Sequence, residues 1–106
     1  MINKLILCTL LITGNLMAKR NITEIVTSLE QAQQTLKPGQ KYYHYKTPDR
    51  IYTIESLSVS HDKNQILVNY ATEYDGKKIL WARVLEDFLS LVNVDEKEIK
   101  KFERIY

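Results

Sequence analysis

The sequence predicts one small, mainly β domain with an amphipathic helix on its N-terminal side, an α+β arrangement overall. Three observations lead to this fold class. Apolar residues recur at helical spacing over residues 21–36, short alternating runs follow from Lys41 onward, and Asp75-Gly76 is a strong signal for a two-residue hairpin turn. The length of 106 residues fits a single domain, and the predicted β domain, residues 37–106, has room for only a small core.

An apolar segment, residues 1–18, precedes the predicted domain. Lys4 followed by an apolar run has the outline of an export signal. Lys19-Arg20 directly after this segment oppose translocation. The apolar run is also shorter than the roughly 20 residues that a membrane-spanning helix needs. We therefore predict a cytoplasmic protein whose translation starts at Met17 and which has no stable membrane span. Export through a signal at residues 1–18 is the alternative.

Residues 19–36 are expected to form the amphipathic helix and to pack on the β domain. The apolar positions recur at spacings of three and four and so gather into one stripe: Ile22, Ile25, Val26, Leu29, Ala32 and Leu36. Asn21 and Glu24 have the spacing of an N-terminal capping box, and Pro38-Gly39 ends the helix.

About five antiparallel strands are expected after the helix, at residues 42–45, 51–59, 66–74, 79–84 and 99–105. Thr47-Pro48-Asp49-Arg50 and Asp95-Glu96-Lys97 are predicted turns. The hydrophobic spacing slips between Ile54 and Leu57, which predicts a β-bulge. A short helical stretch over residues 85–91 precedes the last strand. This order of elements is typical of a small SH3-like barrel.

Few residues in the chain have the spacing that catalysis or metal binding requires. Cys8 is the only cysteine, which excludes an internal disulfide and a zinc site built on several thiolates. His44 and His61 are the only histidines and lie on different segments, without the short spacing of metal ligands. We therefore predict no metal, no cofactor and no catalytic residue.

Aromatic residues are more numerous than the interior of a small barrel requires, so some of them are expected to face outward. Exposed aromatic side chains on small barrels bind extended peptides or single-stranded nucleic acid. Arg83 lies two residues from Trp81, on the same face of a strand, and adds a planar cation. The candidate ligand-binding residues are His44, Tyr45, His61, Tyr70, Tyr74, Trp81 and Arg83.

The alternative is that these rings belong to the core. Tyrosine commonly buries its ring while its hydroxyl stays in water. Trp81, the only tryptophan, lies in the most apolar strand and is expected to be substantially buried. Its truncation is then expected to cost about 3–5 kcal/mol.

Several short motifs follow one another along the chain: Tyr43-His44-Tyr45-Lys46, Tyr74-Asp75-Gly76, Leu80-Trp81-Ala82-Arg83 and Lys101-Phe102-Glu103. In order and spacing they resemble DUF1653, a bacterial family of unknown function. The resemblance implies the small β fold for residues 37–106 and brings no activity with it. The chain departs from the family pattern at Val84, where the family has proline, and at Glu96, where it has a turn glycine.

The predicted function is a non-catalytic binding module for an unknown protein or an extended peptide. The formal charge is only +2, and Lys4 of the leader contributes one of these charges, so single-stranded nucleic acid is not favoured. The alternative is a small hydrolase, or an accessory subunit of an enzyme, that uses His44 or His61 as a general base.

Overall fold

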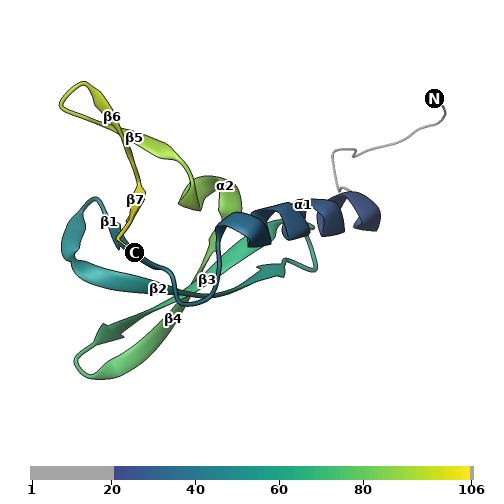
Figure 1. The fold of residues 1–106 in the computed structure, drawn as a ribbon, viewed down its shortest axis with the longest axis horizontal. Coiled ribbons are helices and arrows are strands. Elements are labelled where there is room, and N and C mark those ends of the chain that lie inside the picture. Colours follow the sequence, from purple (N-terminus) through teal and green to yellow (C-terminus); the bar gives the residue numbers. More distant parts are fainter. Residues whose placement is uncertain (1–20, 106) are drawn as a thin grey trace.

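The computed structural model describes residues 21–105, and its elements confirm a mainly β fold with one N-terminal helix (Figure 1). The elements follow along the chain as α1 (Ile22–Thr35), β1 (Lys41–His44), β2 (Thr47–Val59), β3 (Ile66–Tyr74), β4 (Lys77–Val84), α2 (Leu85–Phe88), β5 (Leu91–Val94), β6 (Lys97–Lys100) and β7 (Phe102–Arg104). The leader and Met17 lie outside the described residues, so the start site and the cellular location stay predictions. Within residues 21–105, neither helix has the length and apolar character needed to cross a membrane.

Helix α1 begins at the predicted capping box. The Asn21 side chain accepts a hydrogen bond from the backbone N–H of Glu24 (2.9 Å), and the Glu24 carboxylate accepts one from the backbone N–H of Asn21 (3.4 Å). The helix packs against β2 and β3, with Ile25 0% exposed and the C-cap residue Leu36 2% exposed. Ile22 is largely in solvent, so the buried stripe is narrower than the sequence pattern suggests.

Strands β4, β3, β2, β1 and β7 form one sheet in this order, with antiparallel neighbours. Among the described residues, no ladder joins the edge strands β4 and β7, so the sheet is open. It is nevertheless curved, because the guanidinium carbon of Arg83 in β4 lies 5.1 Å from the centre of the Phe102 ring in β7. The predicted mainly β, α+β fold class is confirmed, and the SH3-like description of it stays a prediction.

Strand β2 begins earlier than the sequence suggests. The predicted turn at Thr47-Pro48-Asp49-Arg50 is wrong, because the chain turns at Tyr45-Lys46 and these four residues begin β2. The ladder with β1 is irregular at this point: the pairing shifts next to His44. Pro48 is tolerated there because a proline without an N–H fits where the regular ladder is interrupted.

Two predicted features of the backbone are confirmed. The register between β2 and β3 shifts between Ile54 and Ser56, at the expected position of the bulge. Strand β3 ends at Tyr74, and Asp75-Gly76 turns the chain into β4 with φ angles of 52° and 75°. Positive φ at both central residues is what a type I′ hairpin turn requires.

The C-terminal part of the chain differs from the prediction. Residues 99–105 are not one strand, because β6 pairs with β5 in a separate hairpin whereas β7 pairs with β1. Helix α2 ends at Phe88, which leaves the following residues free to form β5. The backbone N–H of Lys101 donates to the carbonyl of Ser90 (3.0 Å) and ties the two ends of the hairpin together. Figure 1 shows the hairpin projecting from the rest of the molecule.

The core is largely aromatic. Phe88 of α2 is 1% exposed and stacks on Phe102 of β7, with ring centroids 4.3 Å apart and planes at 10°. Tyr42 and Tyr70 pack against Phe88 with centroid distances of 5.2 and 5.7 Å. The prediction that Trp81 is substantially buried is wrong, since it is 45% exposed. Trp81 lies on β4, an edge strand of the described sheet, so no strand lies on its outer side.

A candidate ligand-binding cavity

The strand registers bring aromatic and basic side chains onto one face of the sheet. Residues that oppose each other in an antiparallel ladder project to the same face. Trp81 is opposite Tyr70, Tyr70 is opposite Ile54, and His44 is opposite Phe102. Ile54 and Phe102 belong to the core, so Trp81 and His44 lie on the face of the sheet that carries the core.

These side chains surround a cavity of about 300 Å³. Four of the residues predicted to bind a ligand line it: His44, Tyr70, Trp81 and Arg83. Its other lining residues, which were not among the predicted ligand-binding residues, are Lys46, Thr47, Tyr52 and Phe102. Tyr52 could have been predicted, because it lies two residues before the buried Ile54 on one strand and therefore projects to the same face.

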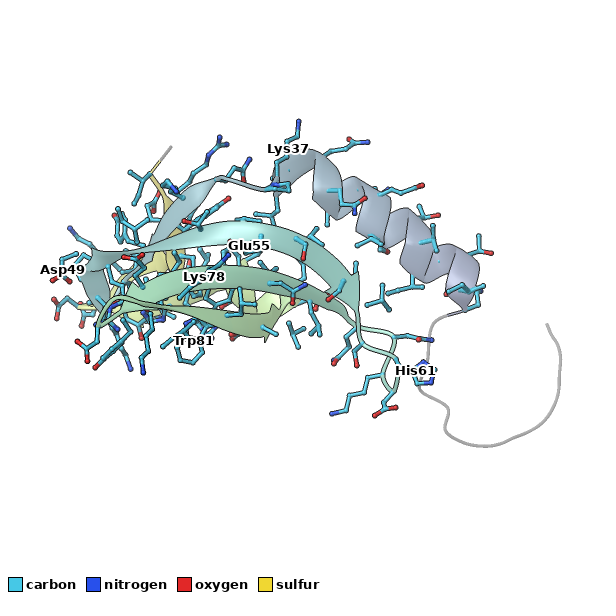
Figure 2. The ribbon with its side chains drawn as sticks, turned by 90° about the horizontal axis from the view of Figure 1, so that it is seen from below. Lys37, Asp49, Glu55, His61, Lys78 and Trp81 are labelled. Atoms are coloured by element: carbon cyan, nitrogen blue, oxygen red, sulfur yellow. The ribbon has the colours of Figure 1, made fainter. Side chains whose placement is uncertain are left out.

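The other three predicted residues lie outside the cavity. Tyr45 is its neighbour, with a ring centroid 4.8 Å from that of His44. Tyr74 lies at the end of β3, where the Arg50 guanidinium carbon is 4.6 Å from its ring centroid. His61 is exposed in the turn between β2 and β3, and Figure 2 shows it far from Trp81, close to the start of α1. The structure therefore brings together four of the seven.

Arg83 is held in place by its neighbours. Its Nε donates a hydrogen bond to the Tyr70 hydroxyl (3.1 Å), and its Nη1 forms an ion pair with Asp87, four residues further along the chain in α2. The ammonium group of Lys101 pairs with the other oxygen of Asp87 at 2.6 Å. Both carboxylate oxygens are therefore occupied, and the guanidinium keeps a fixed position at the edge of the cavity.

Two pKa shifts describe the electrostatics of this region. Hydrogen bonds from Lys101 and then Arg83 hold the pKa of Asp87 below its usual value. The pKa of His44 is lowered, first by burial and then by the positive charges of Arg83, Lys101 and Lys46. The opposing effect of Asp87 is smaller, so the surroundings of His44 carry a net positive potential.

The hydrogen bonding of His44 defines its chemical state. Its Nδ1 accepts a hydrogen bond from the backbone N–H of Lys46 (3.1 Å). A neutral imidazole that accepts at Nδ1 carries its proton at Nε2, so His44 has a donor to offer and no free lone pair. Within residues 21–105 this Nε2 has no hydrogen-bond partner. The hydroxyl of Thr47 is also buried without a partner in the described structure.

Metal binding finds no support in the described part of the chain. Residues 21–105 contain no group of three or more histidine, cysteine, aspartate or glutamate side chains that is arranged to hold a metal ion. Asp87, the carboxylate nearest to Arg83 in the network, is already paired with two cations. The cavity thus combines aromatic walls with hydrogen-bond donors and positive charge.

The fold and this cavity define a small, mainly β domain with a candidate binding site on the concave face of its sheet. A family model described as a protein of unknown function, DUF1653, matches residues 40–104. The chain therefore belongs to the DUF1653 family, as its motifs predicted.

A solved structure supports this assignment at the level of the fold. The crystal structure of a DUF1653 protein from Bordetella bronchiseptica is similar to this chain, with a TM-score of 0.56 and 22% sequence identity. The similarity covers 69% of this chain and 91% of the other. The comparison with curated proteins gave no match.

Proposed function

We propose that this DUF1653 chain is a non-catalytic binding module whose cavity holds one group of its ligand. The proposal rests on one observation: four aromatic rings, two cationic side chains and a histidine line the same cavity. The rings are those of Tyr52, Tyr70, Trp81 and Phe102. Binding cavities are typically apolar with a few converging polar groups, which is the composition found here.

The state of His44 favours binding over general-base catalysis. A general base needs a free lone pair within reach of the proton that it removes. The Nδ1 lone pair of His44 is engaged by the backbone, and Nε2 carries the proton of the neutral ring. In the hydrolase alternative, His44→Ala or His61→Ala abolishes turnover, whereas a module that binds by stacking retains its ligand in the His61→Ala variant.

The test compares two exposed apolar residues that are adjacent on β4 and project to opposite faces of the sheet. Trp81 lines the cavity, whereas Leu80 is 65% exposed and lies on the other face. Ligands retained by the immobilised protein from an extract of its native cells, including small molecules, are identified by mass spectrometry. We expect Leu80→Ala to retain the ligand and Trp81→Ala to lose it.

The melting temperatures of both variants are measured and should lie above the temperature of the retention experiment, so that both variants are folded when they are compared. If Trp81→Ala retains every molecule that the unchanged protein retains, the cavity is not the binding site and the proposal is overturned.

A further inference from the structure

The electrostatics of the cavity exclude one class of ligand that its aromatic walls would otherwise suit. Cavities lined by several aromatic rings commonly bind a quaternary ammonium or a methylated lysine through cation–π contacts. Here Arg83 and Lys46 stand at the cavity, and the nearby carboxylate of Asp87 is neutralised by two cations. A cationic ligand would be repelled, so the occupant is neutral or anionic.

The charged side chains and the imidazole of the cavity offer only hydrogen-bond donors, whereas its hydroxyl groups can both donate and accept. Lys46 and Arg83 have no acceptor atom, and neutral His44 presents an N–H at Nε2. The Tyr70 hydroxyl accepts from Arg83, so its own proton is directed elsewhere. A ligand with carbonyl or phosphate oxygens would pair with these donors, whereas one without acceptors would leave them unsatisfied in a desolvated site.

The cavity offers a flat aromatic surface together with cationic groups. Trp81 offers a half-exposed indole on which a planar ring can stack, and Tyr52 and Phe102 add further rings. Lys46 is exposed in the turn between β1 and β2 and lines the same cavity. The matching ligand has a planar ring with acceptors on its edge and an anionic group attached to it.

We infer that the cavity binds a single nucleotide, with the base stacked on Trp81 and the phosphate at Lys46 and Arg83. The inference rests on the proposed function and specifies its ligand. A phosphorylated tyrosine also joins a ring to a phosphate, but its phenyl ring has no acceptors for His44 or Tyr70. A proline-rich peptide lacks the anion. Residues 21–105 contain 12 Lys and Arg against 13 Asp and Glu, a net charge of −1, which fits a nucleotide-sized contact rather than a long strand.

The test uses nuclear magnetic resonance of the full chain, in which the one tryptophan gives one indole N–H signal. The probes are uridine 5′-monophosphate, uridine, inorganic phosphate, a hexauridylate and a neutral proline-rich peptide. We expect the monophosphate to move the Trp81 indole signal and to bind about tenfold more tightly than uridine, because a charge-assisted contact to phosphate is added. Phosphate alone is expected to leave the indole signal in place.

Two variants, each with a matched control, test where the phosphate and the base of the nucleotide bind. Lys46→Gln is expected to remove the advantage of the monophosphate over uridine, whereas Lys63→Gln, in the distant β2–β3 turn, leaves it within about twofold. Trp81→Ala has no indole signal, so its binding is followed on the backbone amide signals of Tyr70 and Arg83, which line the cavity. Trp81→Ala is expected to weaken both ligands about tenfold or more, whereas Leu80→Ala leaves their affinities unchanged. A hexauridylate that binds no more tightly than the monophosphate identifies a free nucleotide as the ligand, and tighter binding identifies a nucleotide within a chain.

The outcomes separate this inference from the proposed function. If the proline-rich peptide moves the Trp81 signal and the monophosphate does not, the nucleotide is wrong while the binding cavity stands. If uridine and its monophosphate bind equally well, the phosphate contact is wrong. If none of the nucleotide probes moves the signal at millimolar concentration, the inference is overturned, and the retention experiment with Trp81→Ala decides the proposed function separately.

Discussion

The protonation of His44 depends on the fold. Burial, and then the nearby cations of Arg83, Lys101 and Lys46, lower its pKa. An unfolded histidine titrates near pH 6.5, so below this pH the unfolded chain binds more protons than the folded one. The contribution of His44 to stability is therefore complete above about pH 6.5 and decreases as the pH falls through the folded pKa.

We expect the free energy of unfolding to be lower at pH 5 than at pH 7, and this loss to be smaller in His44→Gln. Glutamine does not titrate, and its side-chain oxygen can accept the backbone hydrogen bond of Lys46. Urea unfolding at both pH values measures the effect, with His61→Gln as the control that keeps His44. The lowered pKa of Asp87 acts in a more acidic range, below about pH 4. An equal loss in His44→Gln and the unchanged protein would contradict the assignment.

Phe88 and Trp81 are expected to differ in what they contribute to stability. Phe88 is 1% exposed and stacks on Phe102, so Phe88→Ala should cost about 3–5 kcal/mol, the usual penalty for a large cavity. Trp81 is half exposed, so Trp81→Ala should cost less than about 1.5 kcal/mol. Urea unfolding of the two variants measures the difference. Similar costs would mean that Trp81 is packed more tightly than its exposure indicates.

Among the elements, the β5–β6 hairpin carries the clearest backbone strain. Its turn residues Asp95 and Glu96 have φ angles of 52° and 65°. The left-handed region is unfavourable for residues with a side chain, and most of all outside Asn and Asp. A glycine in place of Glu96 would adopt this conformation without strain.

Glu96→Gly is expected to stabilise the hairpin by about 1 kcal/mol, because the glycine relieves the strain at positive φ. The measurement is hydrogen exchange of the amides in β5 and β6, which should slow. Glu98→Gly is the matched control, since Glu98 lies within β6, where a glycine weakens the strand. Faster exchange in Glu96→Gly would show that the turn does not limit the stability of the hairpin.

At the scale of the whole molecule, the features that could be predicted from the sequence are those that depend on residues close together along the chain. The capping box of Asn21 and Glu24, the bulge after Ile54 and the hairpin turn at Asp75-Gly76 depend on local chemistry and are confirmed. The exposure of Trp81 depends on the strand order, because β4 lies at the edge of the sheet.

The cavity shows the same limit. The residues that line the cavity come from five strands and a turn. Strand alternation could therefore identify single members, such as Tyr52, but not their assembly around one space. The division of the last segment into β6 and β7 also depends on which strand each of them pairs with. No feature within residues 97–104 themselves distinguishes the two partners.

The hydrogen bond between Lys101 and Ser90 has a practical consequence for protein engineering. It holds the two ends of the hairpin side by side, while β5 and β6 pack chiefly against each other. Replacing residues 91–100 by a two-residue Asp-Gly link should leave the urea midpoint of the sheet nearly unchanged, because the closing bond and the β1–β7 ladder remain. A large drop in the midpoint would show that the hairpin supports the core. With the midpoint preserved, this position can carry a foreign peptide, such as an epitope or a fluorescent reporter, without disturbing the cavity.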